Sequence, residues 1–117
     1  MKKTSTAVLT TVALFAAVPA SAHYYDGCQK DKCKSHVIEP HQAHLRAIAT
    51  CESGRRWNYS GPGYYDGGLQ FDPGTWTSVG GAGFAYQHSP REQKYRAVIL
   101  AHRVGCWRCT AGWPHCG

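Results

Sequence analysis

The chain has 117 residues, of which 43% are hydrophobic, and it carries a formal net charge of +6 at neutral pH. This length allows one domain with a thin core and excludes an assembly of several domains, so the fold is expected to need covalent support. The basic residues are scattered, so the charge suits an anionic partner such as a cell wall no better than it suits a merely solvated surface.

The first 22 residues have the pattern of a secretory signal peptide. Lys2 and Lys3 precede a mostly apolar run over residues 8–18, and small residues follow over residues 19–22, where a signal peptidase would cut. The run is short and interrupted by threonine, which favours a cleaved signal peptide over an uncleaved anchor. We therefore expect residues 23–117 to be secreted to the cell wall, without stable membrane insertion.

Six cysteines follow this segment, and an even number in a small exported domain favours disulfides over free thiols. Spacing alone does not choose the pairing. A zinc site made of Cys28, Cys33, Cys106 and Cys109, with histidines from residues 36–44, is the alternative. An exported domain normally oxidises such thiols, so neither a metal nor another cofactor is expected.

The N-terminal part of the mature chain, residues 23–39, is polar and predicts an irregular arm in front of a folded domain of residues 40–117. The first helix of that domain is predicted from Pro40 to Ser53, because proline favours the first helical position and apolar residues then recur at three- and four-residue spacing. Gly54 suits the position just past the helix end.

The segment after this helix, residues 55–68, is rich in glycine, tyrosine and proline and predicts a functional loop or short hairpins. A short strand is predicted at residues 69–71. A short helix follows, for which Asp72 is the expected N-cap and Pro73 the first residue.

The clearest helical signal begins at Ser89, where the sequence Ser89-Pro90-Arg91-Glu92 has the pattern of a capping box. In that motif the serine hydroxyl accepts from the N–H of Glu92, and the Glu92 side chain accepts from the N–H of Ser89. An apolar stripe continues to Val104, and Gly105 ends the helix. The tail beyond it holds two tryptophans and is expected to pack back on the domain.

Glu52 is the carboxylate with the most unusual predicted setting. It lies in the last turn of the first helix, where unpaired carbonyl groups disfavour a negative charge and so raise the pKa of a carboxyl group. Burial beside aromatic rings would raise that pKa further, as a general acid requires. An ordinary exposed glutamate at a helix end is the alternative interpretation.

A cleft that binds sugars needs aromatic faces and uncharged polar groups, and residues 57–76 supply both. Two of the aromatic residues, Trp57 and Phe71, are expected to fill the core instead. A two-carboxylate glycosidase would also need a partner for the acid. Asp66 and Asp72 are the candidates, but a turn explains the first equally well and a helix cap explains the second equally well.

From Leu45 to Gly117 the sequence resembles the catalytic domain of the resuscitation-promoting factors, a transglycosylase-like family of actinobacterial cell-wall enzymes. Specific motifs carry this resemblance in the right order, which argues against chance. They are Ile48-Ala49-Thr50-Cys51-Glu52-Ser53-Gly54 with Trp57, Gly63-Tyr64-Tyr65, Gly67-Gly68-Leu69-Gln70-Phe71-Asp72, Gly74-Thr75-Trp76, Gly80-Gly81, Ser89-Pro90-Arg91-Glu92-Gln93 and Trp113-Pro114-His115-Cys116.

The resemblance implies an α+β, mainly α, lysozyme-like domain with a short β element beside the cleft. It implies that Glu52 is the catalytic acid and that Thr75 contacts the glycan. It suggests further cleft residues, namely Tyr64, Gln70, Asp72 and Trp76. It also implies a disulfide between Cys51 and Cys116, which would tie the end of the catalytic helix to the tail.

Three features depart from the family pattern. Arg55 and Arg56 stand where the family usually has glycine and asparagine, so they are expected either to contact anionic groups of peptidoglycan or to lower the pKa of Glu52. Asp66 has the character of an insertion that is offset by one residue missing before it. The four cysteines outside the implied disulfide are additions, and we expect them to form two further disulfides that staple the arm to the tail.

Together these features predict a monomeric secreted enzyme that acts on the glycan strands of peptidoglycan in cell-wall remodelling or resuscitation. It would cut the β-1,4 bond between N-acetylmuramic acid and N-acetylglucosamine as a muramidase or as a lytic transglycosylase. Nucleic acid is not an expected partner. The main alternative is a non-catalytic glycan-binding module of the same fold, and the second is a cysteine-rich signalling or antimicrobial protein.

Overall fold

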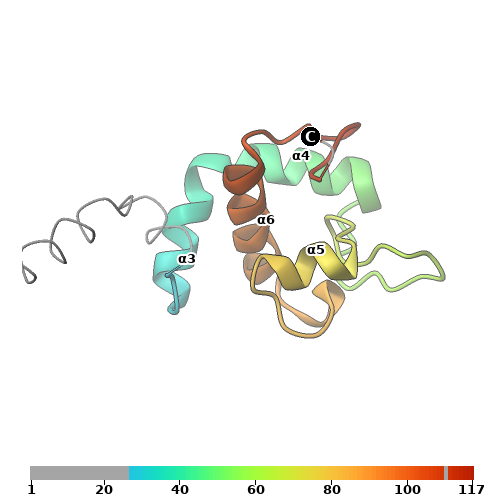
Figure 1. Cartoon of the computed structure of the whole chain (residues 1–117), viewed down its shortest axis with the longest axis horizontal. Coiled ribbons are helices and arrows are strands. Elements are labelled where there is room, and N and C mark those ends of the chain that lie inside the picture. Colours follow the sequence, from blue (N-terminus) through green and yellow to red (C-terminus); the bar gives the residue numbers. More distant parts are fainter. Residues whose placement is uncertain (1–26, 110) are drawn as a thin grey trace, which may run out of the picture.

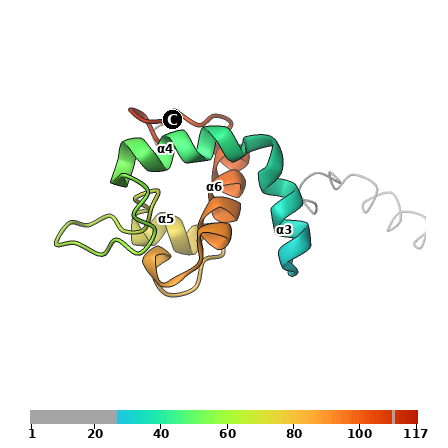
Figure 2. The ribbon, with the colours of Figure 1, turned by 180° about the vertical axis from the view of Figure 1, so that it is seen from behind.

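A computed structural model of the chain describes residues 27–109 and 111–117, so the predicted signal peptide lies outside the described residues. The regular structure is helical: α3 (Asp31–Ile38), η1 (Glu39–His41), α4 (Gln42–Ser53), α5 (Pro73–Ser78), η2 (Ala85–Gln87) and α6 (Pro90–Val104). α4 lies across one end of α6, and α3 packs alongside α6 (Figures 1 and 2). No helix among the described residues has both the length and the apolar character needed to cross a membrane.

α4 forms where the apolar spacing predicts it. Leu45, Ile48 and Ala49 are fully buried along one face of the helix. Pro40 lies in the short 3-10 turn η1, so α4 itself begins at Gln42. Gly54 ends the helix in the left-handed conformation, with φ of 66°, and its N–H donates to the carbonyl of Thr50. That backbone conformation is accessible to glycine at little cost, which is why the helix stops there.

α6 begins at Pro90 and ends at Val104, as predicted, and the hydroxyl of its N-cap Ser89 accepts from the N–H of Glu92. The second half of the predicted capping box is wrong. The Glu92 carboxylate instead accepts from Lys34 of α3 and from Arg96 one turn further along α6. Two cations bind a carboxylate more strongly than one backbone N–H does, so Glu92 joins α3 to α6.

The core lies between α4, α6 and the segment around α5. Trp76 and Tyr95 are its largest fully buried side chains. The Phe71 ring contacts Trp76 and Trp113 edge-on, with centroids 5.1 and 5.7 Å apart. Phe71 is therefore a core residue, as predicted, whereas Trp57 packs against the core while remaining partly exposed. These aromatic contacts supply much of the apolar surface that a domain of this size can bury.

The predicted strand at residues 69–71 is not present, and the described residues contain no strand. The β character reduces to an isolated antiparallel bridge in which the backbones of Asp66 and Phe71 exchange two hydrogen bonds of 3.0 and 2.9 Å. Gln70 has a φ of 55°, in the left-handed region, so the chain turns sharply before the bridge and cannot extend it. The short β element of the predicted fold class is thus unconfirmed beyond this bridge.

All six cysteines are paired, which removes the thiolates that a zinc site would need. Cys51 bonds to Cys116 across 65 residues, as the resemblance implies. The other two bridges are local, from Cys28 to Cys33 and from Cys106 to Cys109. The prediction of two further disulfides is confirmed, but the prediction that they staple the arm to the tail is wrong.

The segment predicted as an irregular arm contains a helix, α3. Its N-cap, Lys30, makes no capping hydrogen bond through its side chain, and its buried residues are Val37 and Ile38 at its C-terminal end. α3 is instead held by α6, through the contact between Lys34 and Glu92 and through a hydrogen bond from Arg91 to Ser35. Tertiary contacts therefore stabilise a helix that its own sequence signals only weakly.

Candidate functional site

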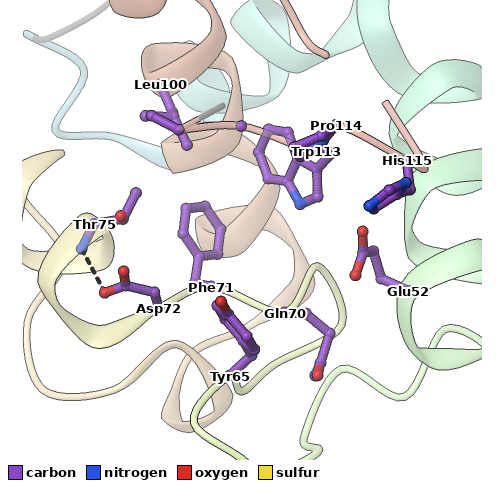
Figure 3. Close-up of a pocket in the computed structure, with 12 residues that line it drawn as sticks. Glu52, Tyr65, Gln70, Phe71, Asp72, Thr75, Leu100, Trp113, Pro114 and His115 are labelled. Carbon is purple, nitrogen blue, oxygen red and sulfur yellow. Dashed lines mark hydrogen bonds between the residues drawn. The ribbon is translucent and has the colours of Figure 1, made fainter. Parts of the chain in front are cut away.

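A cleft of about 410 Å³ opens between the end of α4, the segment before α5 and the C-terminal tail (Figure 3). It combines apolar surfaces with a few polar side chains, as expected of a site for a ligand of this size. The residues that line it are Glu52, Tyr65, Gln70, Phe71, Asp72, Thr75, Leu100, Ala111, Gly112, Trp113, Pro114 and His115.

Glu52 lies at one side of the cleft, in the last turn of α4, and its carboxyl group points inward (Figure 3). Desolvation by burial raises the pKa of Glu52, and the charge of His115 opposes part of that rise. The direction agrees with the sequence prediction, but the main cause is burial. The helix-end carbonyls of Ala49 and Thr50 accept from the N–H groups of Arg55 and Gly54. Because these carbonyls have hydrogen-bond partners, they contribute less negative potential at Glu52.

The opposite side of the cleft is formed at the start of α5. The Asp72 carboxylate caps this helix by accepting from the N–H groups of Gly74 and Thr75, at 2.6 and 3.1 Å. Asp72 is therefore both the predicted N-cap and a lining residue of the cleft. The cap fixes the first turn of α5, and that turn carries the Thr75 side chain on the far side of the cleft from Glu52 (Figure 3).

The edge between these two sides is formed by the turn before α5. Gln70 lines the cleft, and its side-chain amide donates to the carbonyl of Gly67 at 2.9 Å. Gly67 itself has a φ of 78°, and a Cβ there would lie 2.6 Å from the side chain of Gln93. Both the backbone conformation and the close approach therefore require glycine at this position.

The tail closes the remaining side of the cleft. Trp113 is buried, and its indole N–H donates to the carbonyl of Leu69 at 2.7 Å. Its backbone N–H donates to the carbonyl of Trp107 at 2.8 Å, and the Cys51–Cys116 bond anchors the tail to α4. As predicted, the tail packs back on the domain, and in doing so it completes the cleft.

Residues 39–116 match the family model described as the transglycosylase-like domain. The chain belongs to this family. It is 44% identical over 72 residues to the resuscitation-promoting factor RpfE of Mycobacterium tuberculosis. It is 44% identical over 72 residues to RpfC from the same species and 43% identical over 70 residues to Rpf of Micrococcus luteus. The resemblance to the resuscitation-promoting factors is thereby confirmed.

The aligned regions cover 61%, 61% and 59% of this chain. They cover only 39% of RpfE, 48% of RpfC and 29% of Rpf, so the chain spans less than half the length of these relatives. No solved structure matches the chain.

The transglycosylase-like domain brings four of the predicted site residues to its cleft, namely Glu52, Gln70, Asp72 and Thr75. Trp76 is fully buried and donates its indole N–H to the carbonyl of Ala82, so its side chain belongs to the core rather than to the cleft. Tyr64 is 64% exposed on the loop outside the cleft. Its neighbour Tyr65 lines the cleft in its place and contacts the Tyr64 ring edge-on.

The residues that depart from the family pattern do not line the cleft. Asp66 is buried, and its backbone pairs with Phe71 to close the turn, while its carboxylate accepts from the backbone N–H of Tyr86 in η2 at 2.9 Å. This favours the turn role over that of a second catalytic carboxylate. The Arg56 guanidinium donates to the carbonyl of Ser53 and lies over the Tyr59 ring. Arg55 is exposed and has a φ of 62°.

Two residues important for the site had no assigned role in the sequence analysis. Gln93 of α6 is fully buried, and it accepts from the N–H of Gly68 while donating to the carbonyls of Trp57 and His88. The glutamine follows Glu92 in the family motif, but nothing in its spacing indicates three backbone partners. His115 lines the cleft beside Glu52. In the sequence this was indicated only by the position of His115 directly before Cys116, whose disulfide leads back to Cys51.

Proposed function

We propose that this transglycosylase-like domain is a secreted enzyme that cleaves the β-1,4 bond between N-acetylmuramic acid and N-acetylglucosamine in peptidoglycan. Glu52 is the general acid of this reaction. The observation that carries the proposal is the inward-facing Glu52 carboxyl group, whose raised pKa lets it keep its proton closer to neutral pH. The match to the transglycosylase-like domain supports cleavage of a glycan, and the related proteins are named resuscitation-promoting factors.

The bound glycan would lie across the cleft between Glu52 and the start of α5. Tyr65 is the exposed aromatic residue of the lining and offers its ring to a sugar, while Gln70, Asp72 and Thr75 offer polar contacts to hydroxyl and acetamido groups. Tyr64 and Trp76 are left out of this substrate-binding set, because one lies outside the cleft and the other is buried. Positioning of the scissile oxygen within hydrogen-bond reach of Glu52 is what the reaction requires.

In the first step Glu52 protonates the glycosidic oxygen, and the bond from that oxygen to C1 of the muramic sugar breaks through an oxocarbenium-like transition state. In the second step the C6 hydroxyl of the same sugar attacks C1 and gives its proton back to Glu52. The products are a free 4-hydroxyl on N-acetylglucosamine and a 1,6-anhydro muramic end. This route uses one carboxylate twice.

Hydrolysis would require a second group to orient a water molecule. Asp72 is the carboxylate available in the cleft, and its Oδ1 already accepts two backbone hydrogen bonds from α5. Asp66 is buried against η2. The internal attack therefore fits the described residues better than hydrolysis does.

The deciding experiment compares wild-type protein with Glu52→Gln on purified peptidoglycan. We expect soluble muropeptides from the wild type and a loss of at least about 100-fold in the variant, because general acid catalysis contributes on this scale. Glu39→Gln, an exposed carboxylate of η1 outside the cleft, is the matched control. Mass spectrometry of the products separates an anhydro end from an added water molecule.

A non-catalytic glycan-binding module of the same fold is the alternative. It would use the same cleft without needing an acid. Equal muropeptide release by wild type and Glu52→Gln, together with equal sedimentation of both proteins with peptidoglycan, would favour this alternative.

A further inference from the structure

His115 is held beside Glu52 by the disulfide that joins a sequence neighbour of each residue. Cys51 directly precedes Glu52, Cys116 directly follows His115, and the two cysteines are bonded with their Cα atoms 5.7 Å apart. The backbones of the two titratable residues are therefore brought together by the same bond. In Figure 3 the imidazole ring and the carboxyl group face each other across the end of the cleft.

The local backbone of the tail limits where this imidazole can go. Pro114 precedes His115, and proline fixes its own φ and restricts the residue before it. The turn is closed by a hydrogen bond of 2.8 Å from the N–H of Gly117 to the carbonyl of Trp113. Trp113 is in turn fixed by its indole hydrogen bond to Leu69. The imidazole is thus exposed but carried on a constrained turn.

The elements that border the cleft differ in the charged and titratable groups that they bring near Glu52. The tail contributes His115, the segment before α5 contributes Tyr65 and Asp72, and α6 contributes only the apolar Leu100. The two arginines that follow α4, at residues 55 and 56, lie outside the cleft lining. Among these groups His115 is the one whose charge acts on the Glu52 carboxyl.

We propose that His115 is a positioning residue that sets the charge beside the Glu52 carboxyl group and thereby limits glycan cleavage at mildly acidic pH. The inference rests on the proposed function of Glu52, to which it adds a second ionisable group. A histidine is suited to this role because its charge changes within the range in which the acid must hold its proton.

The direction in which His115 changes the cleavage rate follows from the protonation states of His115 and Glu52. Cleavage needs protonated Glu52. A protonated imidazole beside Glu52 favours the ionised carboxylate, which is inactive, whereas a neutral imidazole does not. The wild-type pH profile should therefore carry the titration of two coupled groups rather than one.

The test compares the pH dependence of kcat/KM for wild type, His115→Gln and His115→Lys on purified peptidoglycan. We expect His115→Gln to be on the order of three-fold faster than wild type on the acidic side of the profile, and to converge with it toward alkaline pH. His115→Lys keeps a positive charge toward alkaline pH, so it should be slower than wild type on that side of the profile. His102→Gln, on exposed α6 surface outside the cleft, is the matched control and should follow wild type.

A second measurement does not depend on catalysis. The carboxyl carbon of Glu52 can be followed by NMR during a pH titration of the full protein, with its signal assigned by its absence in Glu52→Gln. A higher titration midpoint in His115→Gln than in wild type supports the inference even if no glycan is cleaved, in which case the proposed function alone fails. An unchanged midpoint, or identical pH profiles in an active enzyme, overturns the role of His115 and leaves the function of Glu52 standing.

Discussion

Replacing Gln93 by leucine should strongly destabilise this domain, because the side chain satisfies three backbone groups from three different segments. Its Oε1 accepts from the N–H of Gly68 at 2.9 Å, and its Nε2 donates to the carbonyls of Trp57 and His88 at 2.8 and 2.9 Å. Leucine has nearly the same volume and removes all three partners at once. Gln93 is fully buried, so in the variant the N–H of Gly68 in particular would have neither a protein group nor water as a hydrogen-bond partner.

The magnitude can be worked from these groups. A buried polar group that loses its partner costs about 1–3 kcal/mol, and Trp57 and His88 are only partly buried, so their carbonyls would cost the lower amount. Added apolar burial of leucine offsets part of the loss. We therefore expect a net loss of about 3 kcal/mol in the free energy of unfolding. For a domain of this size that corresponds to a melting temperature lower by about 12–24 °C.

Thermal and urea unfolding followed by circular dichroism, without reductant, would measure this loss. Gln42→Leu, an exposed glutamine at the start of α4, is the matched control and should change stability by less than about 0.5 kcal/mol. Gln93→Glu keeps the acceptor for the N–H of Gly68 but cannot donate a hydrogen bond when ionised. Its loss of unfolding free energy should therefore be smaller in acid, where the protonated carboxyl group can donate one hydrogen bond. A change below about 1 kcal/mol for Gln93→Leu would refute the reasoning.

Three further predictions concern ionisation and the long disulfide. Burial alone would raise the pKa of Glu92, but hydrogen bonds and charge from Lys34 and Arg96 lower it below the ordinary value. Glu92→Gln should therefore cost about 1–2 kcal/mol at pH 7, as measured by urea unfolding. The difference from wild type should vanish as the pH falls through the lowered pKa of Glu92, where the folded protein also binds the proton. Burial raises the pKa of Glu52, so ionisation of this carboxyl group destabilises the folded protein. Glu52→Gln should therefore raise the melting temperature at pH 7 and leave it unchanged below about pH 4, where the carboxyl group is protonated in both states. A lower melting temperature of the variant at pH 7 would contradict this sign. Replacing both Cys51 and Cys116 by serine should lower the free energy of unfolding by about 4 kcal/mol. The same change at the local Cys106–Cys109 bridge should lower it by about 2 kcal/mol, because that bond closes a much shorter loop. Equal losses in urea unfolding would contradict this dependence on loop length.

The two long helices of the domain could be predicted from the sequence because their signals are local. α6 has a serine N-cap, proline at its first position and a glycine just past its end, and α4 has an apolar stripe that ends at Gly54. α3 has no such signals, since it depends on contacts with a helix that lies 58 residues away at the pair Lys34 and Glu92. The strand predicted at residues 69–71 is reduced to one bridge by the left-handed backbone at Gln70, which the residue types do not indicate.

Much of the candidate site could be predicted because the motifs that carry the family resemblance also carry its cleft residues. Glu52, Gln70, Asp72 and Thr75 lie within 24 residues of the chain and line one cleft. Trp76 follows Thr75 directly, but a helix turns its side chain by about 100° from that of its neighbour, toward the core. His115 is brought to Glu52 by a disulfide across 65 residues, so its position depends on a pairing that spacing cannot choose.

α3 packs against α6 on the far side of α6 from α5 (Figures 1 and 2), and none of its residues lines the cleft. A fusion partner or surface tether joined ahead of residue 27 would therefore leave from the rear of the domain and keep the glycan side open. Immobilising the protein through that end should preserve access to an insoluble polymer, whereas attachment through Gly117 would crowd the tail that borders the cleft.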